Sequence, residues 1–291
     1  MHENRRDMKL CDLHVHSVFS DGTLTPEEIV ARAVRKGLCA VALTDHNTVK
    51  GCARFTAAAE GKPILTICGV ELTAEYEGTE LHLLGLFLPQ EAFGEVEAYT
   101  AEYNARKEES NRLTIRNLQK AGYRICYDEL TAAFPSVGLN RSHIARLLVR
   151  KGYAATVGEA FQSLLNPECG FYTRFHAPDF LTAVAQIKAW GGAAVWAHPL
   201  CHVSLEQARQ ILSAAVAAGL DGAEAYYSTY TPEEQDAMLR LTEQFGIAAS
   251  GGSDFHGDAK PEIDLGSGNG SLAVPFSCCE ALLARIRQTK E

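Results

Sequence analysis

The 291-residue sequence lacks the features of a membrane-spanning or exported protein. No run approaches the roughly 20 consecutive apolar residues that cross a bilayer. The first ten residues, MHENRRDMKL, carry charges where a signal peptide would have its apolar core. We therefore expect a cytoplasmic protein without membrane contact, and nothing in the sequence predicts a protein partner.

Cysteine patterns typical of disulfide frameworks or zinc fingers are also absent. The nine cysteines are scattered, are odd in number and include no C-x-x-C pair. Most lie in apolar runs, as do Cys39, Cys68 and Cys126. This usage predicts reduced, buried thiols in a cytosolic protein.

Positive charge is scarce over most of the chain. The formal net charge of −9 disfavours general nucleic-acid binding, because such binding depends on Lys and Arg that neutralise phosphates. Residues 101–176 differ, with 11 Lys and Arg against 7 Asp and Glu. This mildly basic segment could guide a short RNA, but a long RNA is not expected as the main ligand.

The apolar runs that are present predict an α/β protein. Most of these β-branched runs are separated by helical patterns, which indicates about seven βα units in a parallel sheet or barrel. The first helix has clear boundaries, with Thr25 as N-cap, Pro26 in the first turn and Gly37 after its end. The expected strands are 9–15, 39–44, 64–72, 80–88, 193–197, 222–227 and 247–250.

Residues 90–177 break this rhythm. They contain helical patterns at 91–121, 142–151 and 156–165 and little strand pattern. We expect a small helical insertion here that contributes to the substrate pocket, while residues 1–89 and 178–291 form the barrel.

Histidines gather where the expected strands end. In D-L-H-V-H-S, alternation along a strand places Asp12, His14 and His16 on one face, and Asp254 and His256 share a face in the same way. A lone buried histidine is more often a hydrogen-bonded core residue than a ligand, but nine ligand-type residues at strand ends together predict a metal centre. Asp12 and Asp45 could orient imidazoles, or Asp45 could cap the next helix.

The ligand types indicate the chemistry of this centre. His, Asp and Glu without clustered Cys are typical of hydrolytic Zn, Mn or Fe sites. Two or three divalent ions could be held, with Glu71 as the natural bridge, and a hydroxide that bridges them would attack phosphorus. The sequence contains no G-x-S-x-G, H-E-x-x-H or Walker lysine motif that would suggest another mechanism.

Seven strings in order resemble the PHP (polymerase and histidinol phosphatase) family of metal-dependent phosphoesterases. They are D-L-H-V-H-S, S-D-G, T-D-H-N-T, G-V-E, L-H-L-L-G, A-H-P and G-G-S-D-F-H-G, and they extend over nearly the whole chain. The resemblance implies a distorted (β/α)7 barrel with a trinuclear metal site. Carried over by position, the metal ligands are His14, His16, Asp21, His46, Glu71, His82, His198, Asp254 and His256.

The insertion resembles that of one branch of this family, which includes nucleoside 3′,5′-bisphosphate phosphatases and a 5′–3′ exoribonuclease. Members often carry Gly-Arg-Pro-His in the insertion, where this chain has Asn140-Arg141-Ser142-His143. Many relatives continue with Gly-Arg after A-H-P, but Leu200-Cys201-His202 follows here. One expected cationic group is therefore absent or replaced by His202.

Five residues are candidates for binding or converting the substrate. Arg141 and His143 could hold a phosphate, although Arg141 could instead cap its helix or form an ion pair there. Arg174 could provide a second anion contact, or be a surface residue. Tyr226 or its neighbour Tyr227 could stack on a base, with the other in the core, and His202 could protonate the leaving group.

These observations lead to one hypothesis and two alternatives. We expect a phosphatase with two or three Mn, Fe or Zn ions that hydrolyses the 3′-phosphate of nucleoside 3′,5′-bisphosphates and could act on short 5′-phosphorylated oligonucleotides. In it Glu71, Arg141 and His202 would be catalytic. The alternatives are a phosphatase for histidinol phosphate or another sugar phosphate, and a non-catalytic regulatory module that binds metal.

Overall fold

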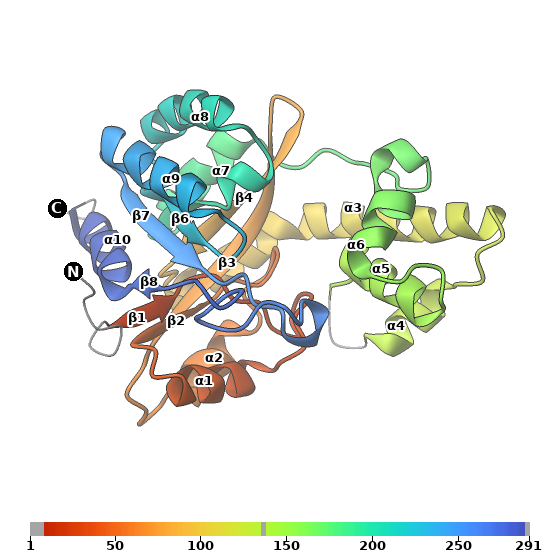
Figure 1. Ribbon diagram of the computed structural model, residues 1–291, viewed down its shortest axis with the longest axis horizontal. Coiled ribbons are helices and arrows are strands. Elements are labelled where there is room, and N and C mark those ends of the chain that lie inside the picture. The colour runs from red at the N-terminus through yellow and green to blue at the C-terminus, as the bar shows by residue number, and fades with distance from the viewer. Residues whose placement is uncertain (1–8, 135–137, 289–291) are drawn as a thin grey trace.

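A computed structural model describes residues 9–134 and 138–288, and a curved eight-stranded sheet forms its body (Figure 1). The strand order is β7-β6-β5-β4-β3-β2-β1-β8. The strands are β1 (Leu10–Asp12), β2 (Ala40–Leu43), β3 (Leu65–Tyr76), β4 (Thr79–Leu86), β5 (Ala193–Ala197), β6 (Gly222–Tyr227), β7 (Ala248–Gly252) and β8 (Val274–Pro275).

The sheet closes almost completely, because the segments that follow β1 and β7 pair with each other. The Leu13 amide donates to the Gly251 carbonyl at 3.1 Å, and the Asp254 amide donates to the His14 carbonyl at 2.9 Å. A parallel bridge joins Val15 to Phe255. The expected α/β barrel is confirmed, and its closure brings the ends of β1 and β7 together.

The barrel is distorted because β4 runs against its neighbours. It pairs antiparallel with both β3 and β5. A tight turn at Glu77 (φ 48°) and Gly78 (φ 83°) joins β3 to β4, and positive φ at two successive residues is the geometry of a type I′ hairpin turn. The short strand β8, antiparallel to β1, was not among the seven expected strands.

Six of the described α-helices lie outside the barrel (Figure 1). The first begins as expected, since the Thr25 side chain accepts from the Glu28 amide and the Glu28 side chain accepts from the Thr25 amide. Thr231 and Glu234 repeat this arrangement at α9. The helices are α1 (Pro26–Arg35), α2 (Cys52–Ala58), α7 (Phe180–Ala189), α8 (Leu205–Ala217), α9 (Pro232–Gln244) and α10 (Phe276–Gln288).

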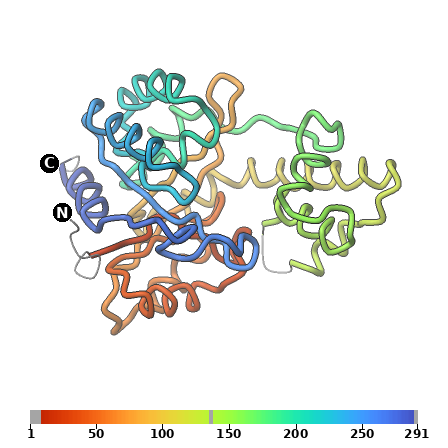
Figure 2. The backbone as a smooth tube through the Cα atoms, in the orientation of Figure 1, coloured from red at the N-terminus to blue at the C-terminus, as the bar shows by residue number. Residues whose placement is uncertain are grey.

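Four of the α-helices between β4 and β5 form a second body. Helix α3 (Phe93–Lys120) leaves the barrel, and α4 (Tyr127–Ala133), α5 (Arg141–Arg150) and α6 (Val157–Ala160) lie around its far part (Figures 1 and 2). These helices enclose an apolar cluster of their own, which includes Leu118, Ile144 and Leu148. The chain then returns to the barrel at α7.

Two further properties concern the whole described chain. All nine cysteines are free thiols, and Cys11, Cys52, Cys278 and Cys279 are buried. None of the helices in residues 9–134 and 138–288 combines the length and apolar character that a bilayer crossing requires.

Candidate metal centre and substrate pocket

The structure gathers all nine predicted ligands at one end of the barrel. Glu71 and His82 lie within β3 and β4, and the other seven lie on the segments that follow β1, β2, β5 and β7, the usual place for the site in such barrels. Seven are buried, whereas His46 and His82 are partly exposed. The potential ligand atoms fall into overlapping groups whose members include His14, His16, Asp21, His46, Glu71, His82, His198, Asp254 and His256.

Glu71 lies at the centre of this cluster. Its Oε1 is 2.9 Å from His82 Nδ1 and 3.1 Å from His198 Nε2. On its other side, Oε2 is 3.0 Å from His46 Nδ1 and 3.2 Å from His16 Nε2. One carboxylate thus contacts imidazoles on two sides, which is the arrangement that a bridging ligand requires.

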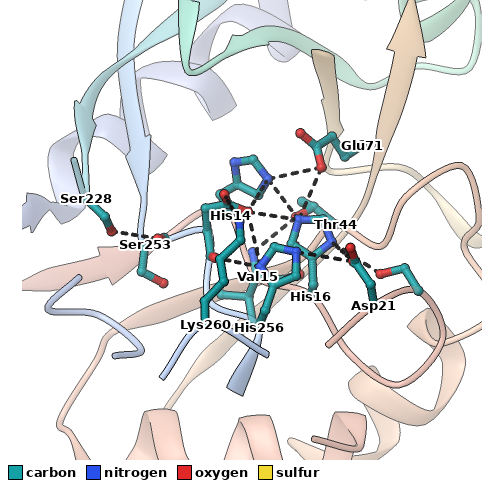
Figure 3. Close-up of polar contacts among 12 residues, drawn as sticks. His14, Val15, His16, Asp21, Thr44, Glu71, Ser228, Ser253, His256 and Lys260 are labelled. Atoms are coloured by element: carbon teal, nitrogen blue, oxygen red, sulfur yellow. Dashed lines mark hydrogen bonds and ion pairs between the residues drawn. The ribbon is translucent and has the colours of Figure 1, made fainter. Parts of the chain in front are cut away.

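Two more carboxylates face imidazoles nearby. Asp254 Oδ1 is 3.3 Å from His16 Nε2 and 3.5 Å from His14 Nε2. Asp21 Oδ1 is 3.2 Å from His256 Nε2. Figure 3 shows the rings of His14, His16 and His256 gathered with Glu71 and Asp21.

The polar atoms in the cluster are better suited to bind divalent cations than to form hydrogen bonds with one another. Glu71 Oε2 and Asp21 Oδ1 are buried and make no hydrogen bond with described residues, although ring nitrogens lie close to both. His14 Nε2 faces His16 Nε2 at 3.1 Å. Buried polar atoms without hydrogen bonds are costly, and deprotonated N and O atoms that converge are what a metal ion needs.

The charges of the carboxylates agree with this role. Burial by itself would raise the pKa of Glu71, but His46, His14 and His82 hold that pKa well below its ordinary value. Asp21 behaves in the same way, because the effect of His256 and His46 on its pKa outweighs that of burial. Both carboxylates therefore carry the negative charge that a metal ligand must have.

Residues behind the cluster orient its imidazoles. Glu224, on β6, lies 3.1 Å from His14 Nδ1 through its Oε1 and accepts from the His198 amide at 2.8 Å through its Oε2. The sequence interpretation missed Glu224, although a carboxylate within a buried strand was a possible signal. Such partners fix ring orientation and make ligands more basic.

The structure also separates the roles of the two aspartates left open above. Asp45 accepts from the Ser20 hydroxyl at 2.6 Å, and that hydroxyl lies 3.2 Å from His16 Nδ1. The N-cap of α2 is Gly51, so Asp45 does not cap that helix. Asp12 accepts from the amide and hydroxyl of Ser253 at 2.8 and 2.5 Å, which positions the residue before Asp254.

Backbone strain accompanies two of the predicted ligands. His198 (φ 30°) and Asp254 (φ 56°) both occupy the left-handed region, which non-glycine residues rarely adopt. Strain of this kind costs of order 1–3 kcal/mol per residue and concentrates at functional sites. Their conformations turn both side chains into the cluster at the strand ends.

A cavity of about 270 Å³ joins the cluster to the helical insertion. Asp21, His46 and His82 line its barrel side, and Arg141 and Lys107 line its insertion side. Its wall also contains the aromatic residues Tyr103, Phe161, Tyr172 and Phe175. The cavity therefore offers cations and ring faces within one space that opens on the predicted ligands.

Arg141 is held in this cavity by two contacts. Its Nη2 donates to Glu80 Oε1 at 3.1 Å, and its guanidinium carbon lies 4.3 Å from the centre of the Tyr172 ring. Arg141 is also the first residue of α5. Asn140 caps this helix, and the ion pair of Arg141 is to Glu80 on β4, so the alternative of a cap or ion pair within the helix is not what the structure shows. The binding of a phosphate by Arg141 stays a prediction.

Lys107, on α3, is a cation of the cavity that the sequence interpretation missed. Within residues 9–134 and 138–288 it forms no hydrogen bond or ion pair, and burial lowers the pKa of its amine to about 8. The sequence indicated only that this segment is mildly basic. It could not show that Lys107 faces the cavity, because helical spacing alone does not tell which residue does so.

Three predicted substrate contacts do not reach this cavity. The buried His143 accepts through Nδ1 from the Asn140 amide at 3.1 Å, and burial lowers its pKa to about 4. Arg174 donates to the Gly78 carbonyl at the β3–β4 turn. Tyr226 packs against the apolar core, whereas strand alternation directs Tyr227 to the cluster, where its hydroxyl donates to Asp254 Oδ2 at 2.8 Å.

His202 and Lys260 lie at a second opening beside the cluster. The His202 ring is next to those of His82 and His198. Lys260 donates to Asp254 Oδ2 at 2.7 Å. Lys260, four residues after His256, was also missed.

Comparisons with known proteins agree with this site. The chain is 33% identical over 249 residues to a 5′-3′ exoribonuclease of Haemophilus influenzae, which covers 85% of this chain and 90% of the relative. It is 29% identical over 260 residues to a 3′,5′-nucleoside bisphosphate phosphatase of Chromobacterium violaceum, covering 88% of this chain and 90% of the relative.

A solved structure extends the similarity to the fold. The crystal structure of a protein described as a metal-dependent phosphoesterase, from Bifidobacterium adolescentis, has a TM-score of 0.84 and 29% identity, and covers 95% of this chain and 96% of its own. Fold, cluster and relatives together define a metal-dependent phosphoesterase. Residues 12–166 match the PHP domain, and the chain belongs to the PHP family.

Proposed function

We propose that this phosphoesterase removes the 3′-phosphate from nucleoside 3′,5′-bisphosphates. The observation that carries the proposal is the cavity with the buried His/Asp/Glu cluster at one side and Arg141 and Lys107 at the other. A substrate with two phosphates could place one at the cluster and the other against these cations. The similarity to a protein named 3′,5′-nucleoside bisphosphate phosphatase supports the same substrate.

In this proposal the nine clustered residues hold two or three divalent ions, of Mn, Fe or Zn. Such ions, when bound, lower the pKa of water and offset the charge of phosphate oxygens. Glu71 holds the ligand set together, since its two oxygens face imidazoles on both sides. Glu224 and Ser20 keep His14 and His16 in their orientations.

The insertion binds and orients the rest of the substrate. The planar guanidinium of Arg141 offers two parallel N–H groups to phosphate oxygens, and stacking on Tyr172 limits its movement. Lys107 adds a second positive charge that no described carboxylate neutralises by an ion pair. The aromatic rings of the wall provide faces on which a base could stack.

A short 5′-phosphorylated oligonucleotide is a second candidate substrate. A cavity of about 670 Å³ adjoins the first, shares His46 and Lys107 with it, and is lined also by Lys50 and Arg112. Additional nucleotides could lie along these cations, and the relative named 5′-3′ exoribonuclease supports this. The rate at which this protein hydrolyses the oligonucleotide should fall steeply as the salt concentration rises, because each contact with a phosphate releases counterions.

The test combines metal content with substrate preference. Elemental analysis of gently purified protein would be run beside hydrolysis of three substrates, with released phosphate measured for adenosine 3′,5′-bisphosphate and histidinol phosphate and released 5′-mononucleotide measured for a short 5′-phosphorylated RNA. We expect two to three ions per chain and the highest kcat/KM for the bisphosphate. A higher kcat/KM for histidinol phosphate would overturn the substrate, and a chain that binds no divalent ion would overturn the mechanism.

A further inference from the structure

His202 extends the predicted ligand cluster beyond the nine residues that the family resemblance assigns. It follows the short turn Pro199–Cys201, four residues after His198. Its ring centre lies 5.3 Å from that of His82 and 5.2 Å from that of His198. One potential ligand atom from each of these three residues lies within 4.8 Å of the other two.

The imidazole of His202 has no other partner in the described part of the chain. Its backbone amide donates to the Pro199 carbonyl at 3.1 Å, but its ring forms no hydrogen bond or ion pair there. His82 and His198, in contrast, both lie against Glu71 Oε1, at 2.9 and 3.1 Å. The His202 residue is solvent-exposed and could turn its ring to water, yet the ring lies against two imidazoles.

We infer that His202 is a further protein ligand to the ion held by Glu71, His82 and His198. The inference rests on the proposed function, in which the cluster holds divalent ions. Three imidazoles and a carboxylate form a donor set that suits Zn, Mn and Fe. The sequence hypothesis that His202 protonates the leaving group gives way to this role, because the metal would occupy the ring nitrogen that would otherwise take up and donate the proton.

A fourth protein ligand has a consequence for the ion itself. Catalytic sites usually supply three protein ligands and leave a position for water or substrate. His202 would occupy one of the positions that such sites leave open. This chain should therefore retain that ion more tightly, with fewer coordination positions open to the substrate.

The test measures metal retention and does not depend on turnover. Wild type, His202→Ala and the control His176→Ala would be dialysed against a graded series of a chelator, and the ions per chain counted by elemental analysis. His176 is an exposed imidazole paired with Glu75 outside the cluster. Loss of an outer partner of a ligand lowers affinity about 10- to 100-fold, and loss of a direct ligand should weaken one ion by at least this much.

The outcomes separate this inference from the proposed function. We expect H202A to lose one ion at a lower chelator concentration than wild type and H176A, and its Co²⁺-loaded form to change absorption spectrum. Equal retention in all three proteins would overturn the inference alone, whether or not kcat falls. A wild type that binds no ion would overturn both. If H202A folds poorly, His202→Gln provides the same comparison.

Discussion

At the scale of single residues, Arg141 is the group whose contacts best prepare it to bind a phosphate. Glu80 and Tyr172 hold its guanidinium in the cavity. Arg141→Ala should raise KM for adenosine 3′,5′-bisphosphate about 10- to 100-fold and change kcat little, because hydrogen bonds to charged groups contribute about 1.5–3 kcal/mol. Steady-state kinetics would measure both constants.

The control for this change is Arg141→Lys. It keeps the charge but loses the two parallel N–H groups, so its KM should lie between those of wild type and R141A. A KM that is the same in wild type and R141A would remove Arg141 from the substrate site.

The charge of Lys107 should make kcat/KM depend on pH. Burial lowers its pKa to about 8, so the amine is charged below that pH and neutral above it. A substrate phosphate needs the charged form, and kcat/KM reports the free enzyme, so kcat/KM should fall as pH rises through about 8. Lys107→Arg, which stays charged, should lose this alkaline decline.

Lys107→Met is the control that removes the positive charge but keeps a long side chain. Its kcat/KM should be low at neutral pH and should lack the decline near pH 8 that Lys107 causes. If wild type and K107R decline together with pH, another group causes the loss and Lys107 does not bind the substrate.

At the scale of elements, we expect the helical insertion to unfold as one unit, separately from the barrel. Leu148, on α5, is fully buried in the separate apolar cluster of these helices. Leu148→Ala should destabilise it by about 2–5 kcal/mol. Hydrogen exchange should then accelerate in residues 93–165 and not in the barrel, and KM should rise because α5 carries Arg141.

Leu205→Ala is a matched control for this change. Leu205 is 39% exposed on α8, so its truncation should alter stability by no more than about 0.5 kcal/mol. Faster exchange throughout the barrel in L148A would show that insertion and barrel unfold together.

The elements also show what the sequence could and could not predict. The βα rhythm and the helix cap at Thr25 could be predicted because spacing and capping are local signals. The direction of β4 was not, since alternation of apolar residues says nothing about whether a strand runs parallel to its neighbour. The residues at Glu77 and Gly78 were the available signal for a hairpin.

The same distinction holds in the site. His14 and His16 could be placed on one face because strand alternation is strict. That rule also separates Tyr226 from Tyr227, but it does not say which of them faces the cluster. Lys107 and Glu224 depend on contacts between segments far apart in the sequence, which no local pattern reveals.

At the scale of the whole molecule, the cluster connects folding with metal binding. Its ligands come from β3, β4 and the segments that follow β1, β2, β5 and β7, so bound ions would hold this end of the barrel together. Ions at 1,000 times their dissociation constant stabilise a fold by about 4 kcal/mol, which for a chain near this size raises Tm by roughly 8–16 °C. Chelation should therefore lower Tm by about this amount.

The matched control for chelation is Glu71→Ala, which removes the carboxylate that faces imidazoles on both sides. This variant should bind fewer ions as purified, so its Tm should respond much less to a chelator, and re-addition of the metal should restore only the wild type. The comparison does not depend on the substrate, so it tests the metal centre separately from the nucleotide. Equal shifts of Tm in the two proteins would mean that the chelator acts elsewhere, and an unchanged wild-type Tm would mean that the cluster folds without ions.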